Sequence, residues 1–165
     1  MSYHDKNFEG RINDTMWNHS EDLFEQLWDG PWERYGLGEQ SRNMASWKYS
    51  PFVSHTPDYR AALGAKTQPM LVEVQGSAGR YHKFKGKKLA ALGKWNSIDE
   101  VTFWLWNEET KQPTWVSYAQ IRLMTHRPGA EYTDTLFDGK RPGWRIPCEM
   151  VSEMADTDRL NDRYG

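Results

Sequence analysis

The sequence predicts an α/β fold, a single domain in which a central mixed β-sheet is flanked by helices. Two short apolar segments, 70–75 and 101–106, have the length and composition of buried strands. Apolar residues at helical spacing precede and separate these segments, as expected of helices that cover a sheet. The length of 165 residues favours one domain, and nine Trp, eight Tyr and six Phe residues predict a core rich in aromatic side chains.

The first helix is expected to begin at Asn13, a good capping residue, and to end before Asp29-Gly30-Pro31. Its apolar residues recur at helical spacing and centre on one face: Met16, Trp17, Leu23, Phe24, Leu27 and Trp28. Glu21 falls at the edge of this face, whereas Glu25 lies farther toward solvent. For either residue alone, the simplest role is that of a solvated helix surface.

Residues 31–50 suggest one or two short strands or an ordered loop, and Pro51 to Ser54 could form a strand. The next residues, His55-Thr56-Pro57-Asp58, lead into a turn because a proline holds the residue before it in an extended conformation. Asp58 is therefore expected at a strand end or in a turn.

The clearest strand is Met70 to Gln75, opened by Pro69 and closed by Gly76. Alternation along this strand places Glu73 and Gln75 on the same face. After a turn at 76–79, the expected elements are a lysine-rich helix (84–95), an interior strand (101–106), an adjacent antiparallel strand (114–118) and a short helix with Ile121 and Met124 inward (119–125). These elements complete a core of residues 13–125, between an N-terminal arm (1–12) and a C-terminal loop and tail (126–165).

The charge of the chain is unevenly distributed, although its formal net value is only -2. Residues 79–94 contain six of the 21 Lys and Arg residues and none of the 23 Asp and Glu residues. Lysine is unfavourable near a helix N-terminus unless an anion compensates it, and a phosphate group would do so. The pattern predicts a basic patch on an acidic body, although such a patch is also consistent with a solvated helix face.

Asp58 and Glu73 are hard oxygen donors, the ligand type that Mg²⁺ prefers. Taken alone, an Asp and a Glu at this spacing are ordinary surface residues. Their context is more specific, because Pro57-Asp58 is followed by an apolar strand that carries Glu73-Val74-Gln75, and then by the basic segment.

In this context the chain resembles the PD-(D/E)xK nuclease superfamily, which includes restriction enzymes, Holliday-junction resolvases and phage or recombination exonucleases. The resemblance covers roughly residues 13–125, with the core motif at 57–75, and it implies a restriction-endonuclease-like αβββαβ core. It further implies that Asp58 and Glu73 bind Mg²⁺ or Mn²⁺. Glu21 is the better match for an acidic residue on the first helix, and Glu25 is the second.

The sequence departs from the superfamily pattern at Gln75, which stands where the pattern has lysine. Some restriction enzymes use Gln there, and in other members the lysine is displaced to a neighbouring element. The resemblance therefore implies that Gln75 orients water or metal and that Lys83 or Lys85 contacts the scissile phosphate. The residues expected to bind nucleic acid are Arg80, Lys83, Lys85, Lys87 and Lys88.

Other chemistries have less support in the sequence. The five histidines show no HxxxH or HxH pairing, and no GxxxxGK[ST] loop is present. With a single cysteine, Cys148, no intramolecular disulfide can form, and without a signal-like apolar stretch or a run of about 18 apolar residues, a soluble cytoplasmic protein is expected. For a phage-encoded protein this would be the host cytoplasm.

The sequence thus predicts a metal-dependent deoxyribonuclease that acts on DNA, with branched and single-stranded forms left open as substrates. The alternative is a catalytically inactive DNA-binding or assembly protein that keeps the nuclease fold. A third interpretation is a structural protein with no nucleic-acid role. Because junction-resolving and restriction enzymes are often dimers, a homodimer is expected by analogy.

Overall fold

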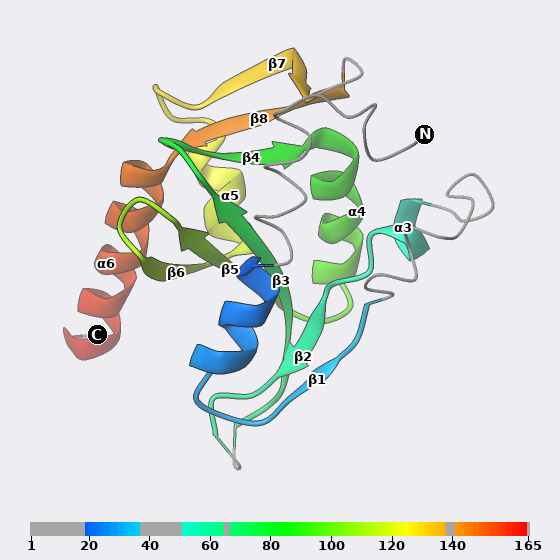
Figure 1. Ribbon diagram of the computed structural model, residues 1–165, viewed down its shortest axis with the longest axis vertical. Helices are drawn as coiled ribbons and strands as arrows, with labels where there is room; N and C mark the ends of the chain where they lie inside the picture. Colours follow the sequence, from blue (N-terminus) through cyan, green and yellow to red (C-terminus); the bar gives the residue numbers. More distant parts are fainter. Residues whose placement is uncertain (1–18, 37–50, 65–66, 138–140, 165) are drawn as a thin grey trace.

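The computed structural model describes residues 19–36, 51–64, 67–137 and 141–164. Within them, a five-stranded mixed sheet is covered by helices, and a second, three-stranded sheet lies across its upper end (Figure 1). The predicted α/β class with a mixed central sheet and flanking helices is confirmed. The predicted arm (1–12) and the first residues of the predicted first helix lie outside the described residues.

The larger sheet has the strand order β1-β2-β3-β5-β6. Its strands are β1 (Trp32–Arg34), β2 (Tyr59–Ala61), β3 (Met70–Ser77), β5 (Val101–Asn107) and β6 (Gln112–Ser117). β1, β2 and β3 pair antiparallel, β3 and β5 pair parallel, and β5 and β6 pair antiparallel. Together with a helix at 19–27 and helix α4 (Gly86–Asn96), these elements follow the expected αβββαβ order, with the short helix α3 (Pro51–Ser54) inserted before β2 and strand β4 inserted before α4.

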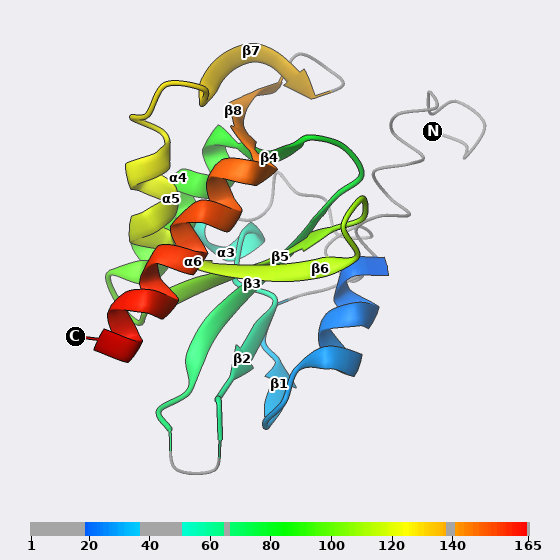
Figure 2. The ribbon, with the colours of Figure 1, turned by 90° about the vertical axis from the view of Figure 1, so that its left-hand side faces the viewer.

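Helices cover both faces of this sheet, and a separate apolar core lies on each (Figure 2). Leu71 of β3 belongs to the core shared with α4, α5 (Tyr118–Met124) and α6 (Cys148–Tyr164). Val72 and Val74 belong to the core that contains Phe24 of the 19–27 helix. Because side chains alternate along a strand, Glu73 points to the same side as Leu71, which is the side of α4.

The smaller sheet has the order β4-β8-β7, and all its pairings are antiparallel: β4 (Tyr81–Lys85), β8 (Arg141–Pro147) and β7 (Glu131–Phe137). The prediction of a helix from residue 84 was wrong at its start, because β4 continues to Lys85 and α4 begins at Gly86. β4 is a strand because its burial alternates: His82 and Phe84 are buried, whereas Lys83 is exposed. β3 also extends to Ser77, beyond its expected last residue, Gln75.

Residues 126–165 were predicted to be a loop and tail, but they contain β7, β8 and α6. These elements are ordered by long-range burial: Ile146 of β8 and Val151 and Met154 of α6 lie in the α4-side core. By contrast, the predictions for β5, β6 and α5 are confirmed, with every residue of 101–106 buried and Ile121 and Met124 inward.

Residues Pro51–Ser54 form the short helix α3, and not the predicted strand. Proline is well tolerated in the first turn of a helix, where its missing N–H has no intrahelical partner to lose. The ring of Phe52 stacks on Trp95 of α4 with centroids 4.2 Å apart, and Trp95 Nε1 donates to the Phe52 carbonyl at 2.9 Å. This contact anchors the segment that leads to Asp58 against α4.

The buried stripe of the first helix is narrower than its sequence suggested, because Leu27, predicted on its apolar face, is 52% exposed. Among the described residues, none of the helices is long and apolar enough to cross a membrane.

Candidate active site

Asp58 closes an open stretch of the edge of β3. β2 is only three residues long and pairs with β3 at Met70 to Val72. Beyond that point, the Val74 N–H donates to Oδ2 of Asp58 at 2.9 Å in place of a ladder partner. Because Tyr59 pairs with Val72, the same register brings the buried Asp58 opposite Glu73. The early end of β2 is therefore what places a carboxylate against this strand.

Glu73 is 1% exposed and forms an ion pair with Lys88. The Nζ atom of Lys88, from the first turn of α4, lies against Oε1 of Glu73. The Oε2 atom is buried and has no hydrogen-bond partner among the described residues. Lys88 keeps 26% of its side chain exposed, whereas its ammonium group is buried against Glu73.

Asp58, Glu73 and Lys88 act as one electrostatic unit. Burial raises the pKa of Asp58 and of Glu73, and the Asp58 carboxylate raises that of Glu73 further, to about 8. Burial acts to lower the pKa of Lys88, but the two carboxylates outweigh it and hold this pKa above its ordinary value. The ammonium group is therefore charged at neutral pH, whereas the carboxyl pair retains part of a proton.

Glu21 of the 19–27 helix approaches the same cluster and is held by Arg34 of β1. Burial and the Asp58 carboxylate raise the pKa of Glu21 to about 7, against the opposing charge of Arg34. Arg34 donates from Nη1 to Oε1 of Glu21 at 3.1 Å and from Nη2 to Glu25 at 3.0 Å. Its guanidinium also lies 4.8 Å from the ring centre of Tyr59, whose hydroxyl donates to Glu25 at 2.7 Å. Glu21, and not Glu25, is therefore the helix residue whose charge couples to Asp58.

The basic rim of the cluster is formed where α4 begins. This rim consists of Lys85, Lys87 and Lys88, and His55, three residues before Asp58, lies beside it. Burial lowers the pKa of His55, and the charges of Lys88, Lys85 and Lys87 lower it further, to about 4. Its imidazole is neutral at neutral pH. Three lysines and two buried carboxylates thus gather around the point where residues 55–58 pass the start of α4.

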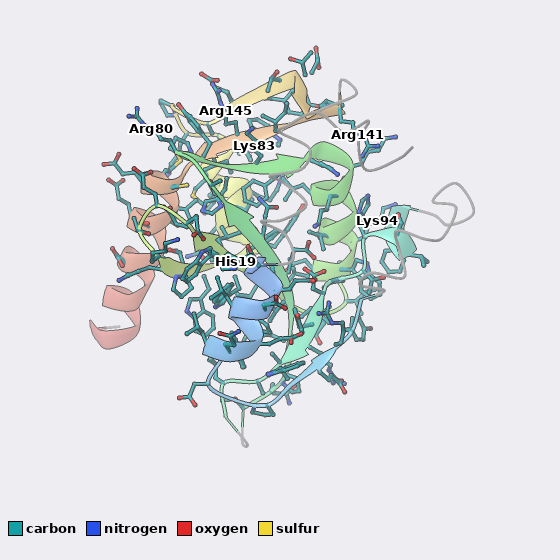
Figure 3. The ribbon with its side chains drawn as sticks, viewed as in Figure 1. His19, Arg80, Lys83, Lys94, Arg141 and Arg145 are labelled. Atoms are coloured by element: carbon teal, nitrogen blue, oxygen red, sulfur yellow. The ribbon has the colours of Figure 1, made fainter. Side chains whose placement is uncertain are left out.

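The other residues predicted for the site are placed as follows. Gln75 links β3 to β4, because its Nε2 donates a hydrogen bond to the carbonyl oxygen of Lys83 at 2.7 Å. Lys83 itself points outward from β4, and Lys87 is exposed at the start of α4. Arg80 is exposed in the bend before β4 (Figure 3). Of the lysines predicted near the site, Lys88 is the one seen in an ion pair with Glu73.

The residues present fit a divalent cation held through two carboxylates. Among the described residues, no three His, Cys, Asp or Glu side chains converge closely enough to form a metal site by themselves. Mg²⁺ often binds proteins through one or two carboxylates, with waters and substrate phosphates in its other positions. The partnerless Oε2 of Glu73 and the raised pKa values of both carboxyl groups are features that a cation between Asp58 and Glu73 would relieve.

Sequence reasoning missed the roles of Lys88 and Arg34 within the cluster. Lys88 was expected to grip a flanking phosphate, and it lies instead against Glu73. The signal that could have found it is its place two residues after Gly86, in the first turn of the helix that faces β3. Arg34 belongs to an exposed three-residue strand without a motif, and no local pattern indicated it.

The stability of the metal-free protein should fall between about pH 6.5 and pH 8. Glu21 and Glu73 have folded pKa values of about 7 and about 8 against an ordinary 4.5, so in this window the folded state binds more protons than the unfolded state. Each such proton contributes a slope of at most about 1.4 kcal/mol per pH unit. Urea unfolding at several pH values measures the effect.

The window for this experiment starts at pH 6.5 because two histidines act in the opposite direction below it. Burial lowers the pKa of His55 and of His82 to about 4 from 6.5, so their contribution to stability rises with pH between these values. A Glu73→Gln variant should flatten the decline above pH 6.5. A wild-type free energy of unfolding that rises between pH 6.5 and pH 8 would contradict the assignment.

Comparison with known proteins gave matches in structure but not in sequence. No family model matches the chain, and no curated protein matches it. Its fold is similar to that of Hjc, a Holliday junction resolvase from the archaeal hyperthermophile Archaeoglobus fulgidus, with a TM-score of 0.48, 15% identity, and coverage of 84% of this chain and 98% of that one. It is also similar to D212, a nuclease from a fusselovirus, with a TM-score of 0.48, 12% identity, and coverage of 88% and 87%.

Proposed function

We propose that this protein is a metal-dependent deoxyribonuclease that hydrolyses phosphodiester bonds in DNA, with Mg²⁺ or Mn²⁺ as its cofactor. The observation that carries the proposal is the buried pair of Asp58 and Glu73 with the ammonium of Lys88 against it. Burying two like charges side by side is costly for stability, and carboxyl groups perturbed in this way are concentrated at functional sites. Glu73 lies on the apolar strand β3 and Asp58 follows Pro57 ahead of β2, which is the order of the nuclease motif that the sequence resembles.

In this function Asp58 and Glu73 hold the ion, and Glu21 assists directly or through water. When bound, the ion polarises the scissile phosphate and activates the attacking water. The protein contributes the fixed geometry of the two carboxylates. The Val74 N–H orients Asp58, and the pairing of β2 with β3 keeps it opposite Glu73.

Lys88 takes the part of the lysine that the motif expects at the position of Gln75. Its Nζ already lies at the carboxylate of Glu73, and its side chain is partly open to solvent. In the complex with DNA this ammonium donates to a phosphate oxygen on which negative charge develops during attack. Because its pKa is held above the ordinary value, Lys88 acts as a charged electrostatic stabiliser and not as a base.

Arg34 of β1 holds Glu21 in position. Its guanidinium holds one carboxylate oxygen of Glu21 and is itself fixed by Glu25 and by the ring of Tyr59. This arrangement keeps Glu21 charged more readily than burial alone would allow. Lys85, Lys87 and Arg80 would contact the phosphates that flank the scissile bond.

The alternative, an inactive DNA-binding protein, had Gln75 as its main support. The presence of Lys88 at Glu73 supplies the cation that Gln75 lacks, and it therefore favours the enzyme. Gln75 has a different use, since it ties β4 to β3.

Incubation with supercoiled plasmid, linear duplex and a four-way DNA junction should give cleavage with Mg²⁺ or Mn²⁺ and none with EDTA. The substrates separate a general nuclease from one restricted to branched DNA. Binding should be measured in the same samples by gel shift. DNA binding without cleavage in the presence of either ion would identify the inactive DNA-binding protein, and absence of both binding and cleavage would exclude a role on DNA.

A further inference from the structure

The outward face of the three-stranded sheet carries a second group of cations. On β4, Lys83 and Lys85 alternate with the buried His82 and Phe84 and so point away from the core. The pairing of β4 with β8 places Arg145 opposite Lys83 and Gly143 opposite Lys85, and Arg141 follows on the same side of β8. With Arg80 just before β4, these residues form the outer basic face: Arg80, Lys83, Lys85, Arg141 and Arg145. Figure 3 labels Arg80, Lys83, Arg141 and Arg145.

The centre of this face is an unfavourable arrangement for folding alone. Lys83 and Arg145 are direct cross-strand partners with charges of the same sign, and such pairs destabilise a sheet. Arg145 is held in place by an ion pair with Glu131 of β7 and by the ring of Tyr81, whose centre is 4.4 Å from the guanidinium carbon. A polyanion bound across the two strands would relieve the repulsion between Lys83 and Arg145.

The outer basic face is joined to the candidate active site through β4. Gln75, two residues after Glu73 on β3, donates to the backbone of Lys83 at 2.7 Å. At its other end β4 runs directly into α4, whose first turn carries Lys88. One strand therefore connects the cations of the face with the cation at the carboxylate pair.

We propose that the outer basic face binds the phosphate backbone of double-stranded DNA beside the bond that is cleaved. The proposal rests on the nuclease function proposed above, and it assigns to β8 a part in DNA binding. A duplex fits better than a single strand, because proteins bind single strands largely by stacking bases on open aromatic rings. On the described part of this face the aromatic side chain is Tyr81, and Arg145 already covers its ring.

The test is the binding of a fluorescent duplex of about 20 base pairs in EDTA over a range of salt concentrations. Each phosphate neutralised contributes about 0.9 to the slope of log K against log salt. The double variant Lys83→Gln with Arg145→Gln should bind at least about tenfold more weakly and lower the slope by about 2. The control is Lys94→Gln, at the far end of α4, which should keep the wild-type slope.

A second variant tests DNA binding by the outer basic face without removing any of its cations. Glu131→Gln removes the carboxylate that competes with phosphate for Arg145. It should make the fall of log K with log salt steeper by up to about 0.9 and tighten duplex binding about twofold or more. A variant that only disturbed the fold would not strengthen binding, so this result is independent of any folding defect in the double variant, which circular dichroism would detect.

The proposal is overturned if the folded double variant keeps the wild-type affinity for the duplex and the wild-type salt dependence. It is also overturned if a single strand of the same length binds the wild type as tightly as the duplex does and loses as much affinity in the double variant. These outcomes are distinct from a failure of the nuclease function. The binding assay contains no metal and involves no cleavage, so a protein that cleaves no DNA can still show the predicted loss of binding.

Discussion

Replacing Asp58 by Asn should reduce Mg²⁺-dependent DNA cleavage by at least about 100-fold, a loss typical of removing one charged group from an electrostatic catalytic site. The amide oxygen of Asn can still accept the hydrogen bond that Val74 N–H donates to Asp58, so the edge of β3 stays closed. The substitution also removes one of two adjacent buried carboxylates and, with it, one cause of the raised pKa of Glu73. We therefore expect lost cleavage in a protein that is folded and no less stable at pH 8 than the wild type.

Cleavage rates should be measured with plasmid DNA at several Mg²⁺ concentrations, together with thermal unfolding with and without the ion. Binding of a ligand only to the folded state raises the midpoint of unfolding, so Mg²⁺ should stabilise the wild type and not the variant. Glu33→Gln is the matched control, because Glu33 is an exposed carboxylate on β1, at the same side of the sheet. Wild-type cleavage by Asp58→Asn would exclude Asp58 as a metal ligand.

The acidic half of the site could be predicted because it depends on local sequence. Pro57 and the short apolar strand fix where Asp58 and Glu73 lie along the chain, and the pairing of β2 with β3 brings them together. The basic half could not be predicted in the same way. The boundary between β4 and α4 decides whether Lys85 lies on a strand or on a helix, and Lys88 reaches the carboxylates because the first turn of α4 packs beside β3, which is a long-range contact.

The elements missed at the C-terminal side have a different cause. β7 and β8 contain few apolar residues, and their strand conformation depends on pairing: β8 pairs with β4, about 60 residues earlier in the chain, and β7 pairs with β8. α6 differs from these strands, because the spacing of its buried residues Val151, Met154 and Ala155 is a local pattern that indicates a helix, and the prediction of a tail overlooked it. The second sheet, by contrast, is determined by distant partners.

Replacing Lys88 by Met should lower the cleavage rate by about 100- to 1,000-fold at saturating DNA and Mg²⁺, the loss expected when one donor to the developing phosphate charge is removed. Met keeps most of the length and apolar stem of the side chain, so the packing of α4 on β3 should survive. Without the ammonium, Glu73 and Asp58 lose the charge that opposes the rise of their pKa values. The free energy of unfolding should therefore fall more steeply with pH between 6.5 and 8 than in the wild type.

Lys87→Met is the control that separates catalysis from binding, because Lys87 is the exposed neighbour in the same first turn of α4. It should weaken DNA binding and lower its salt dependence, while single-turnover cleavage at saturating DNA stays close to that of the wild type. Lys88→Met should show the reverse, with a slow single-turnover rate that added DNA does not restore. If the two variants behave alike in both measurements, Lys88 is one more phosphate contact, and the cation that stabilises the transition state has to come from another residue.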